Sequence, residues 1–327
     1  MKKFLKVIYI LLAVFILFVL GFGTYFNMKY PVKLLAEDVK VESTPQRLER
    51  GKYLVNHVTN CVDCHSKRDF SKFAGPVTPG TEGMGGDIFS EEMGFPGNIV
   101  APNITPAGIG NYTDGELIRA ITQGIAKDGR ALFPLMPYQN FGKMDKEDIY
   151  SIIAYIRTLK PIENKTELTK LNFPLNFIVK SIPSKNEFGK IPDKSNTIKY
   201  GEYMVLSAGC GDCHTPRVKG DPVPGKEFAG GFSINATPTM TITSANITPD
   251  TETGIGKLTK DDFIKKFASY RDPAVSNAAV QPEQFQTFMP WSLFSGMTDE
   301  DLGAIYDYLR TMKPVSNKVE KFVIKKF

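Results

Sequence analysis

The sequence contains little cysteine and little histidine, only four and three of these residues in a chain of 327. All four cysteines and two of the three histidines belong to one pentapeptide that occurs twice, as Cys61-Val-Asp-Cys64-His65 and as Cys210-Gly-Asp-Cys213-His214. Because the two copies use every cysteine, none remains for a disulfide framework. Stability must therefore come from packing and from any group that the pentapeptides hold.

C-x-x-C-H is the attachment signature of a c-type haem. Two thiols one helical turn apart add across the two vinyl groups of one porphyrin, and the histidine then lies beneath the iron as its proximal ligand. The sequence therefore predicts two covalently bound haem c groups. Their attachment residues are Cys61, Cys64, Cys210 and Cys213, and their proximal ligands are His65 and His214.

A structural zinc ion bound by the same cysteines and histidines is the alternative to haem. The two ligand pairs of a zinc site, however, usually lie within a few tens of residues of each other. Here the pairs are separated by about 150 residues. A thioredoxin-like redox pair would not need a histidine after the second cysteine in both copies. Haem remains the expected cofactor.

Acidic residues are missing from the first thirty positions, where Val7 to Phe26 form an uncharged apolar run. Twenty residues in a helix span about 30 Å, the thickness of a hydrocarbon core. The lysines ahead of the run predict a cytoplasmic N-terminus, with the haem domains on the periplasmic side of the cytoplasmic membrane. We expect an uncleaved, single-pass anchor that contacts membrane lipid, and a cleaved signal peptide is the alternative.

The net charge of +5 gives no indication of a nucleic-acid partner. Most of the excess comes from lysines in the first thirty residues, namely Lys2, Lys3, Lys6 and Lys29. The remainder is nearly neutral, and haem propionates would make it more negative. A length of 327 residues with 42% apolar content suits two domain cores.

The pentapeptides are part of a longer repeat. Asn103-Ile-Thr-Pro106 recurs as Asn246-Ile-Thr-Pro249, and the amphipathic segment 144–161 recurs as 297–314 at a constant offset of 153. The expected organisation is an anchor at 1–28, a linker at 29–44, a first domain at 45–162, a connector at 163–194, a second domain at 195–315 and a basic tail at 316–327. The connector is too apolar for a free tether, so we expect it to pack along the domains.

A helix leading into C-x-x-C-H, a Gly- and Pro-rich loop region, a Met-Pro and a closing amphipathic helix resemble the class I cytochrome c fold. The resemblance implies an all-α chain, with an N-terminal transmembrane helix followed by two tandem class I cytochrome c domains. It also implies that a glycine of the first helix packs against an aromatic residue of the last, Gly51 with Tyr155 and Gly201 with Tyr308.

The Asn-Ile-Thr-Pro and Met-Pro-Tyr/Trp elements resemble more specifically the multi-haem cytochrome subunit of membrane-bound alcohol and gluconate dehydrogenases. That subunit typically has three haem domains, whereas two are expected here. In the related fold a proline carbonyl after C-x-x-C-H orients the proximal histidine. Pro76, in Phe73-Ala-Gly-Pro76, would serve the first haem, but the second repeat reads Phe228-Ala-Gly-Gly231.

Only His57 remains as a third histidine, so at least one iron must have a methionine ligand or an open face. Met136 and Met289 are the expected sixth ligands, because they lie in equivalent places 71 and 75 residues after their proximal histidines. The alternative methionines are Met84, Met93 and Met240. We expect His57 to be a surface or helix-packing residue, and Tyr138 and Trp291 to be either propionate donors or core aromatics.

Two six-coordinate irons leave no site for a substrate. The expected function is therefore a membrane-anchored electron carrier, without catalytic residues, between a dehydrogenase or other donor and a respiratory acceptor. A di-haem enzyme of the peroxidase or thiosulfate-oxidising type is the alternative. Such an enzyme would need additional histidines or a spare cysteine, and the chain has neither.

Overall fold

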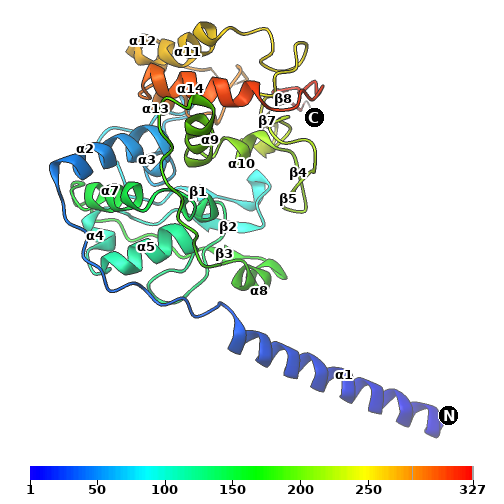
Figure 1. Cartoon of the computed structure of the whole chain (residues 1–327). Coiled ribbons are helices and arrows are strands. Elements are labelled where there is room, and N and C mark those ends of the chain that lie inside the picture. The colour runs from blue at the N-terminus through cyan, green and yellow to red at the C-terminus, as the bar shows by residue number, and fades with distance from the viewer. Residues whose placement is uncertain (282, 326–327) are drawn as a thin grey trace.

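The computed structural model describes residues 1–281 and 283–325. Pro282, within the predicted second domain, and residues 326–327 of the predicted tail lie outside the described residues. A long N-terminal helix projects from a body in which the second repeat lies against the first (Figure 1). We refer below to residues 45–162 and 195–315 as the first and second repeats.

The N-terminal helix and the first repeat, with the connector, contain these helices: α1 (Lys2–Lys29), α2 (Pro45–Tyr53), a π-helical segment (Leu54–Val58), α3 (Cys61–Cys64), α4 (Pro106–Ile109), α5 (Asp114–Gln123), α6 (Tyr138–Phe141), α7 (Lys146–Ile156) and α8 (Leu175–Ile178). The second repeat contains α9 (Thr197–Ser207), α10 (Cys210–His214), α11 (Lys260–Ala268), α12 (Pro273–Ser276), α13 (Trp291–Phe294) and α14 (Asp299–Arg310). Single 3-10 turns occupy Glu91–Met93, Val179–Ser181 and Ser269–Arg271.

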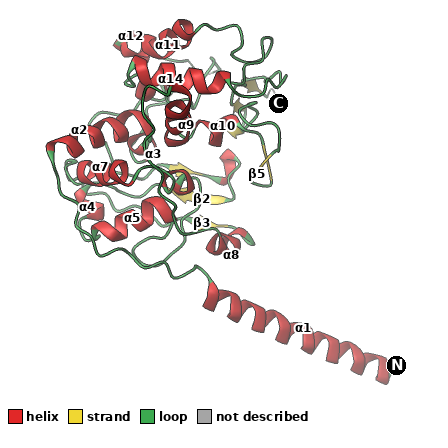
Figure 2. Cartoon of the chain, viewed as in Figure 1, coloured by secondary structure: helices red, strands yellow, loops and turns green. Residues whose placement is uncertain are grey.

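The chain is mainly helical, but three small antiparallel sheets depart from the all-α expectation (Figure 2). Their strands, in sheet order, are β1 (Ile88–Phe89), β2 (Gly97–Val100) and β3 (Lys170–Leu171); β4 (Arg217–Val218) and β5 (Asp221–Pro222); and β6 (Ser233–Asn235), β7 (Met240–Thr243) and β8 (Phe322–Ile324). Strands of two to four residues carry no recognisable alternation in the sequence. β8 belongs to the predicted basic tail, which therefore packs as the outer strand of a sheet.

In each repeat the first helix crosses the last at a glycine, as the resemblance implied. A Cβ atom on Gly51 of α2 would overlap the carbonyl of Ser151 in α7 and come within 2.8 Å of Tyr155 Cβ. On Gly201 of α9 it would overlap the equivalent carbonyl in α14 and approach Tyr308 Cβ at 3.0 Å. Only a residue without Cβ lets the two backbones approach this closely.

The first repeat has one more residue than the second between the tyrosine of its first helix and its first cysteine. The π-helical segment absorbs this residue, because a π turn closes over five residues and not four, as in the bond from Thr59 N to Leu54 O at 2.8 Å. In the second repeat α9 continues as an ordinary α-helix. Both repeats therefore deliver C-x-x-C-H in the same relation to the helix crossing.

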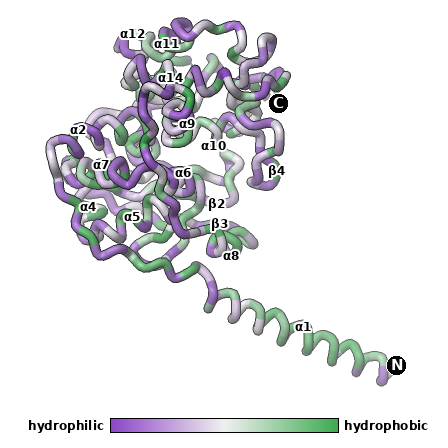
Figure 3. The backbone as a smooth tube through the Cα atoms, viewed as in Figure 1, coloured by the Kyte–Doolittle hydropathy of each residue, from purple (hydrophilic) through white to green (hydrophobic). Residues whose placement is uncertain are grey.

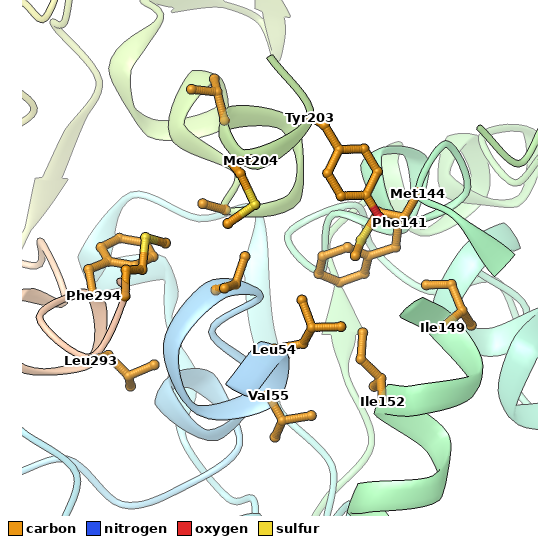
Figure 4. Packing of buried hydrophobic residues seen from close by; sticks show 14 of the residues in the cluster. Leu54, Val55, Phe141, Met144, Ile149, Ile152, Tyr203, Met204, Leu293 and Phe294 are labelled. Atoms are coloured by element: carbon orange, nitrogen blue, oxygen red, sulfur yellow. The ribbon is translucent and has the colours of Figure 1, made fainter. Parts of the chain in front are cut away.

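The repeats contact each other through a reciprocal pair of buried carboxylates. Tyr203 of α9 donates to Asp148 Oδ2 of α7 at 2.6 Å and accepts from the Asp145 amide at 3.2 Å. In the equivalent arrangement Tyr53 donates to Asp301 of α14 and accepts from the amide of Thr298, the N-cap residue of that helix. Both carboxylates are 1% exposed. Apolar side chains of both repeats surround this contact (Figure 4).

The predicted linker and connector are packed segments and not free tethers. The linker lies across α5 and α7, with the Val41 amide bonded to Asp114 at 2.8 Å and Glu37 bonded to Lys146 at 2.8 Å. The connector supplies β3 and buries Val179, as expected, but Phe173 is 84% exposed. Among the described residues α1 is the one helix with the length and apolar character to cross a membrane (Figure 3).

Replacing Gly51 with alanine tests the helix crossing. The added Cβ atom has no room beside the Ser151 carbonyl, so we expect the free energy of unfolding to fall by about 1–3 kcal/mol. Gly303→Ala in α14 is the matched control, because its Cβ atom would make only ordinary contacts at 3.5 Å and beyond. Denaturant unfolding measures both, and equal stabilities of the two variants would contradict the crossing.

Candidate haem-binding sites

Each C-x-x-C-H forms a short helix that begins with a residue in the left-handed conformation. Asn60 precedes α3 with φ 53°, and Gly209 precedes α10 with φ 65°. Asparagine and glycine are the residues that adopt this conformation at least cost. The chain can therefore turn sharply out of the preceding helix and start a new one at the first cysteine.

Both predicted proximal histidines make the same hydrogen bond. His65 Nδ1 lies 2.7 Å from the carbonyl oxygen of Pro102, and His214 Nδ1 lies 2.7 Å from that of Ala245. A carbonyl only accepts, so Nδ1 carries the proton and Nε2 keeps its lone pair. Burial lowers the pKa of both imidazoles, which favours the neutral form that binds a metal. An imidazole oriented in this way is arranged as an axial ligand.

The repeated Asn-Ile-Thr fixes the segment that carries each accepting carbonyl. Asn103 accepts from the amide and hydroxyl of Thr105 at 2.9 and 2.7 Å, and its amide donates to Ile162 O at 2.8 Å. Asn246 repeats these bonds with Thr248 at 2.9 and 2.7 Å and with Val315 O at 2.7 Å. In each repeat the asparagine side chain thus connects the segment that carries the accepting carbonyl to the chain that follows the last helix.

The expected role of Pro76 is wrong. The structure places Pro102 at His65 instead, immediately before the Asn-Ile-Thr, where the second repeat has Ala245. Any residue can supply a carbonyl, so the absence of proline from Phe228-Ala-Gly-Gly231 has no consequence for His214. The sequence feature that could have identified these carbonyls is their position directly before the repeated Asn-Ile-Thr, and the type of residue gives no indication.

Phe73-Ala-Gly-Pro76 and Phe228-Ala-Gly-Gly231 are also not structurally equivalent. The glycine that bonds to the proximal histidine's carbonyl is Gly85 in the first repeat, at 2.8 Å, and Gly230 in the second, at 2.7 Å. Each has a positive φ, and a Cβ atom on either would overlap the backbone that holds the accepting carbonyl. The segment 83–86 therefore corresponds to 228–231.

The loop around Pro76 docks onto the second repeat. Its Ala74 amide donates to the buried Gln286 side chain at 2.7 Å, and its Phe70 ring lies edge-on to Phe288 with 5.5 Å between centroids. Arg68 holds the loop closed by donating to the Ala74 carbonyl at 2.6 Å. This loop of the first repeat therefore packs against Phe288, the residue before Met289, in the second repeat.

Met136 and Met289 lie in matching turns. The Tyr138 amide donates to the Met136 carbonyl at 2.8 Å, and the Trp291 amide donates to the Met289 carbonyl at 2.8 Å. The proline between the two residues has φ of −79° in both copies. Both side chains are half-buried and pack against the core. Met93 and Met240 lie elsewhere, in a 3-10 turn and in β7.

The four cysteines lie in the two short helices α3 and α10. Burial raises the pKa of the Cys61 and Cys64 thiols, and it raises that of Cys210 to about 12. The described residues contain no group of three or more His, Cys, Asp or Glu side chains placed to hold a metal ion.

The second attachment helix contacts the first repeat. Asn140 of α6 donates to Asp212 of α10 at 2.7 Å and ties the first repeat to the second attachment helix.

An unmatched polar group indicates that one site accommodates a further molecule. The Tyr138 side chain is 1% exposed, and its hydroxyl has no hydrogen-bond partner among the described residues. Leaving a buried hydroxyl unpaired costs about 1–3 kcal/mol. The residues present thus fit a group that carries acceptor oxygens, as haem propionates do. Trp291 differs, because it stacks on Tyr270 with 5.1 Å between centroids.

His57 packs against the second repeat, one of the two placements expected for it. Its Nδ1 lies 3.0 Å from the carbonyl oxygen of Leu293, and Gly296 leaves room for the ring. The π-helical segment carries His57, so the extra residue of the first repeat brings a side chain into the contact between the repeats.

Comparison with known proteins supports a cytochrome. The profile of the family described as cytochrome c matches residues 198–313. The chain is 31% identical over 283 residues to the cytochrome c subunit of an alcohol dehydrogenase (quinone) from Gluconacetobacter polyoxogenes, covering 82% of this chain and 56% of that protein. It is 29% identical over 278 residues to the fructose dehydrogenase cytochrome subunit of Gluconobacter japonicus, covering 81% and 52%.

A smaller relative matches part of the chain. A diheme cytochrome c-type protein from Cereibacter sphaeroides is 30% identical over 166 residues, which are 48% of this chain and 53% of that protein. The chain thus spans about half the length of the curated relatives it matches.

The pKa of His57 tests the buried contact. Burial lowers this pKa below the ordinary 6.5, and Lys52 lowers it further, so an NMR titration should give a midpoint below 6.5. His57→Asn identifies the signal, and Lys52→Gln should raise the midpoint. Because the unfolded chain takes up this proton at the ordinary pKa, the folded state loses stability as the pH falls below 6.5. A midpoint at or above 6.5 would place the ring in solvent.

Proposed function

This chain carries a cytochrome c domain and is a relative of the cytochrome c subunits of alcohol and gluconate dehydrogenases, and from this premise we propose that it is a membrane-anchored di-haem c-type cytochrome. Residues 45–162 and 195–315 are its two cytochrome c domains. It transfers electrons from a dehydrogenase to a respiratory acceptor. Haem c, when bound, supplies the one-electron chemistry.

The observation that carries this proposal is the matched pair of histidines. Both donate Nδ1–H to a backbone carbonyl at 2.7 Å, and both carbonyls precede the same Asn-Ile-Thr. Two sites built alike by different residues favour two haems of the same kind. Cys61 and Cys64 would attach one, and Cys210 and Cys213 the other.

Met136 and Met289 are the proposed sixth ligands. Their identical backbone turns support equivalent roles, and both lie beside the core with side chains that are only half-buried. A thioether ligand favours ferrous iron and raises the reduction potential, which suits a respiratory carrier. A histidine and a methionine on each iron would leave neither haem with an open position for a substrate.

The contact of the first repeat with the second attachment helix supports transfer between the two sites. Asn140 of the first repeat holds the second attachment helix, and the Tyr203–Asp148 bond fixes the helices on either side. The chain's own residues therefore set the separation and orientation of the sites and keep water from the contact between them.

The partner and the location follow from the relatives and from α1. The related proteins are named as subunits of dehydrogenases, and a dehydrogenase is accordingly the proposed donor. Helix α1 is the proposed anchor, with basic residues on the cytoplasmic side and the repeats on the periplasmic side.

Haem quantitation under alkaline pyridine tests the proposal. We expect two c-type haems per chain, one after the double substitution Cys61→Ser/Cys64→Ser, and one after Cys210→Ser/Cys213→Ser, since each pair attaches its own porphyrin. One or no haem in the unmodified chain would reject it. Rapid, tight binding of CO or cyanide by the unmodified protein would reveal an open iron and favour the di-haem enzyme.

Replacing each methionine with histidine tests the sixth ligands. Met136→His and Met289→His should each lower one of two reduction potentials by on the order of 100 mV, because imidazole stabilises ferric iron relative to a thioether. Met93→His, in the 3-10 turn, is the control and should leave both unchanged. A redox titration that shows no shift in either test variant would assign the ligand to another residue.

A further inference from the structure

The last turn of α1 packs against the connector. The Phe26 ring stacks on Phe177 of α8 with 4.0 Å between centroids, and Lys180 donates to the Asn27 side chain at 2.7 Å. Figure 1 shows α8 beside the end of α1, at the base of the body. The connector therefore meets the anchor at its outer end and nowhere along its length.

This contact fixes the depth of α8 relative to a bilayer. Phe26 is the last residue of the uncharged run that begins at Val7, and a helix of that length extends about 30 Å. If that run fills the hydrocarbon core, a side chain that stacks on Phe26 lies at the boundary between acyl chains and headgroups. Phe177 occupies this level.

Exposed apolar side chains gather in the segments next to this contact. After α1, in residues 30–281 and 283–325, the large apolar side chains that are more than half exposed are Leu35, Leu168, Phe173 and Val218. Three of these four belong to the linker and the connector. Phe173 is 84% exposed and Ile178 of α8 is 44% exposed. Phe173 and Ile178 flank Phe177, which stacks on the last turn of α1, so these exposed apolar groups lie in the segment that meets the anchor and indicate a surface that is covered in the working protein.

Basic residues of the same segment suit a lipid surface. Lys180 donates to Asn27 at the end of α1, and Lys170 in β3, which pairs with Glu167 at 3.6 Å, has a side chain that is 77% exposed. Phenylalanine in the acyl boundary with lysine at headgroup level is the composition of interfacial membrane segments. The linker, bonded to α5 and α7, holds the body beside the anchor in a fixed orientation.

We infer that the connector around α8 is a second membrane contact, in which Phe173 and Ile178 enter the interfacial region of the bilayer beside the end of α1. This inference rests on the proposed anchoring of the chain by α1. The contact sets the tilt of the two repeats above the membrane and so determines which face meets an electron donor.

Photolabelling of the full haem-loaded chain in vesicles tests the contact. Vesicles of phosphatidylcholine contain a phospholipid with a diazirine near the headgroup end of its acyl chain, and labelled peptides are mapped by mass spectrometry. We expect label in α1 and in residues 171–180. Phe173→Glu/Ile178→Glu should reduce the label in residues 171–180 about tenfold, because burying a glutamate at this level is unfavourable, while the label in α1 stays constant.

Val218→Glu is the matched control, since Val218 is an exposed apolar residue of β4 on the second repeat, and it should change neither signal. Label in α1 without label in residues 171–180 overturns the inference and leaves the anchor intact. Label in residues 171–180 without label in α1 rejects the anchor, and it overturns the inference as well, because the contact is defined beside the end of a membrane-inserted α1. Cross-links from residues 171–180 to a second protein chain in place of lipid also overturn it.

Discussion

Two buried carboxylates, Asp148 and Asp301, hold the two repeats together. A carboxylate with 1% exposure is costly unless hydrogen bonds and an opposite charge compensate it. Asp148 accepts two hydrogen bonds of 2.8 Å from Arg50 of its own repeat and one from Tyr203 of the other repeat. Asp301 accepts from Tyr200 of its own repeat at 2.9 Å and from Tyr53 of the other. Each carboxylate thus combines donors of both repeats, and the contact between the repeats completes its hydrogen bonding.

Within each repeat the site is built largely from backbone. The accepting carbonyls belong to Pro102 and Ala245, two residues with nothing else in common, and glycines with positive φ let the chain pass close to them. Asn103 and Asn246 are the side chains that hold these carbonyls in place. The second repeat can therefore differ widely from the first in sequence and still orient its histidine identically.

The sequence was sufficient to predict features that depend on residue type. The glycine at each helix crossing is an example, because only a residue without Cβ lets the two helices approach this closely. The sequence was insufficient to identify the carbonyls that bond to His65 and His214, since every residue has a carbonyl. The likeness of 73–76 to 228–231 also led to the wrong prediction that Pro76 supplies the first of them. The small sheets and the packed linker were also missed, because isolated tertiary contacts leave no periodic pattern.

The reciprocity of the Tyr–Asp contact has a further consequence. Each repeat supplies one hydroxyl and one carboxylate, so the surface is self-complementary in the manner of a two-fold symmetric homodimer. Joining two such units in one polypeptide replaces a concentration-dependent association with an intramolecular one. Covalent fusion also lets the halves differ: the first repeat has a π turn and a histidine at the junction, and the second has a regular helix, an asymmetry that two identical subunits of a dimer cannot have.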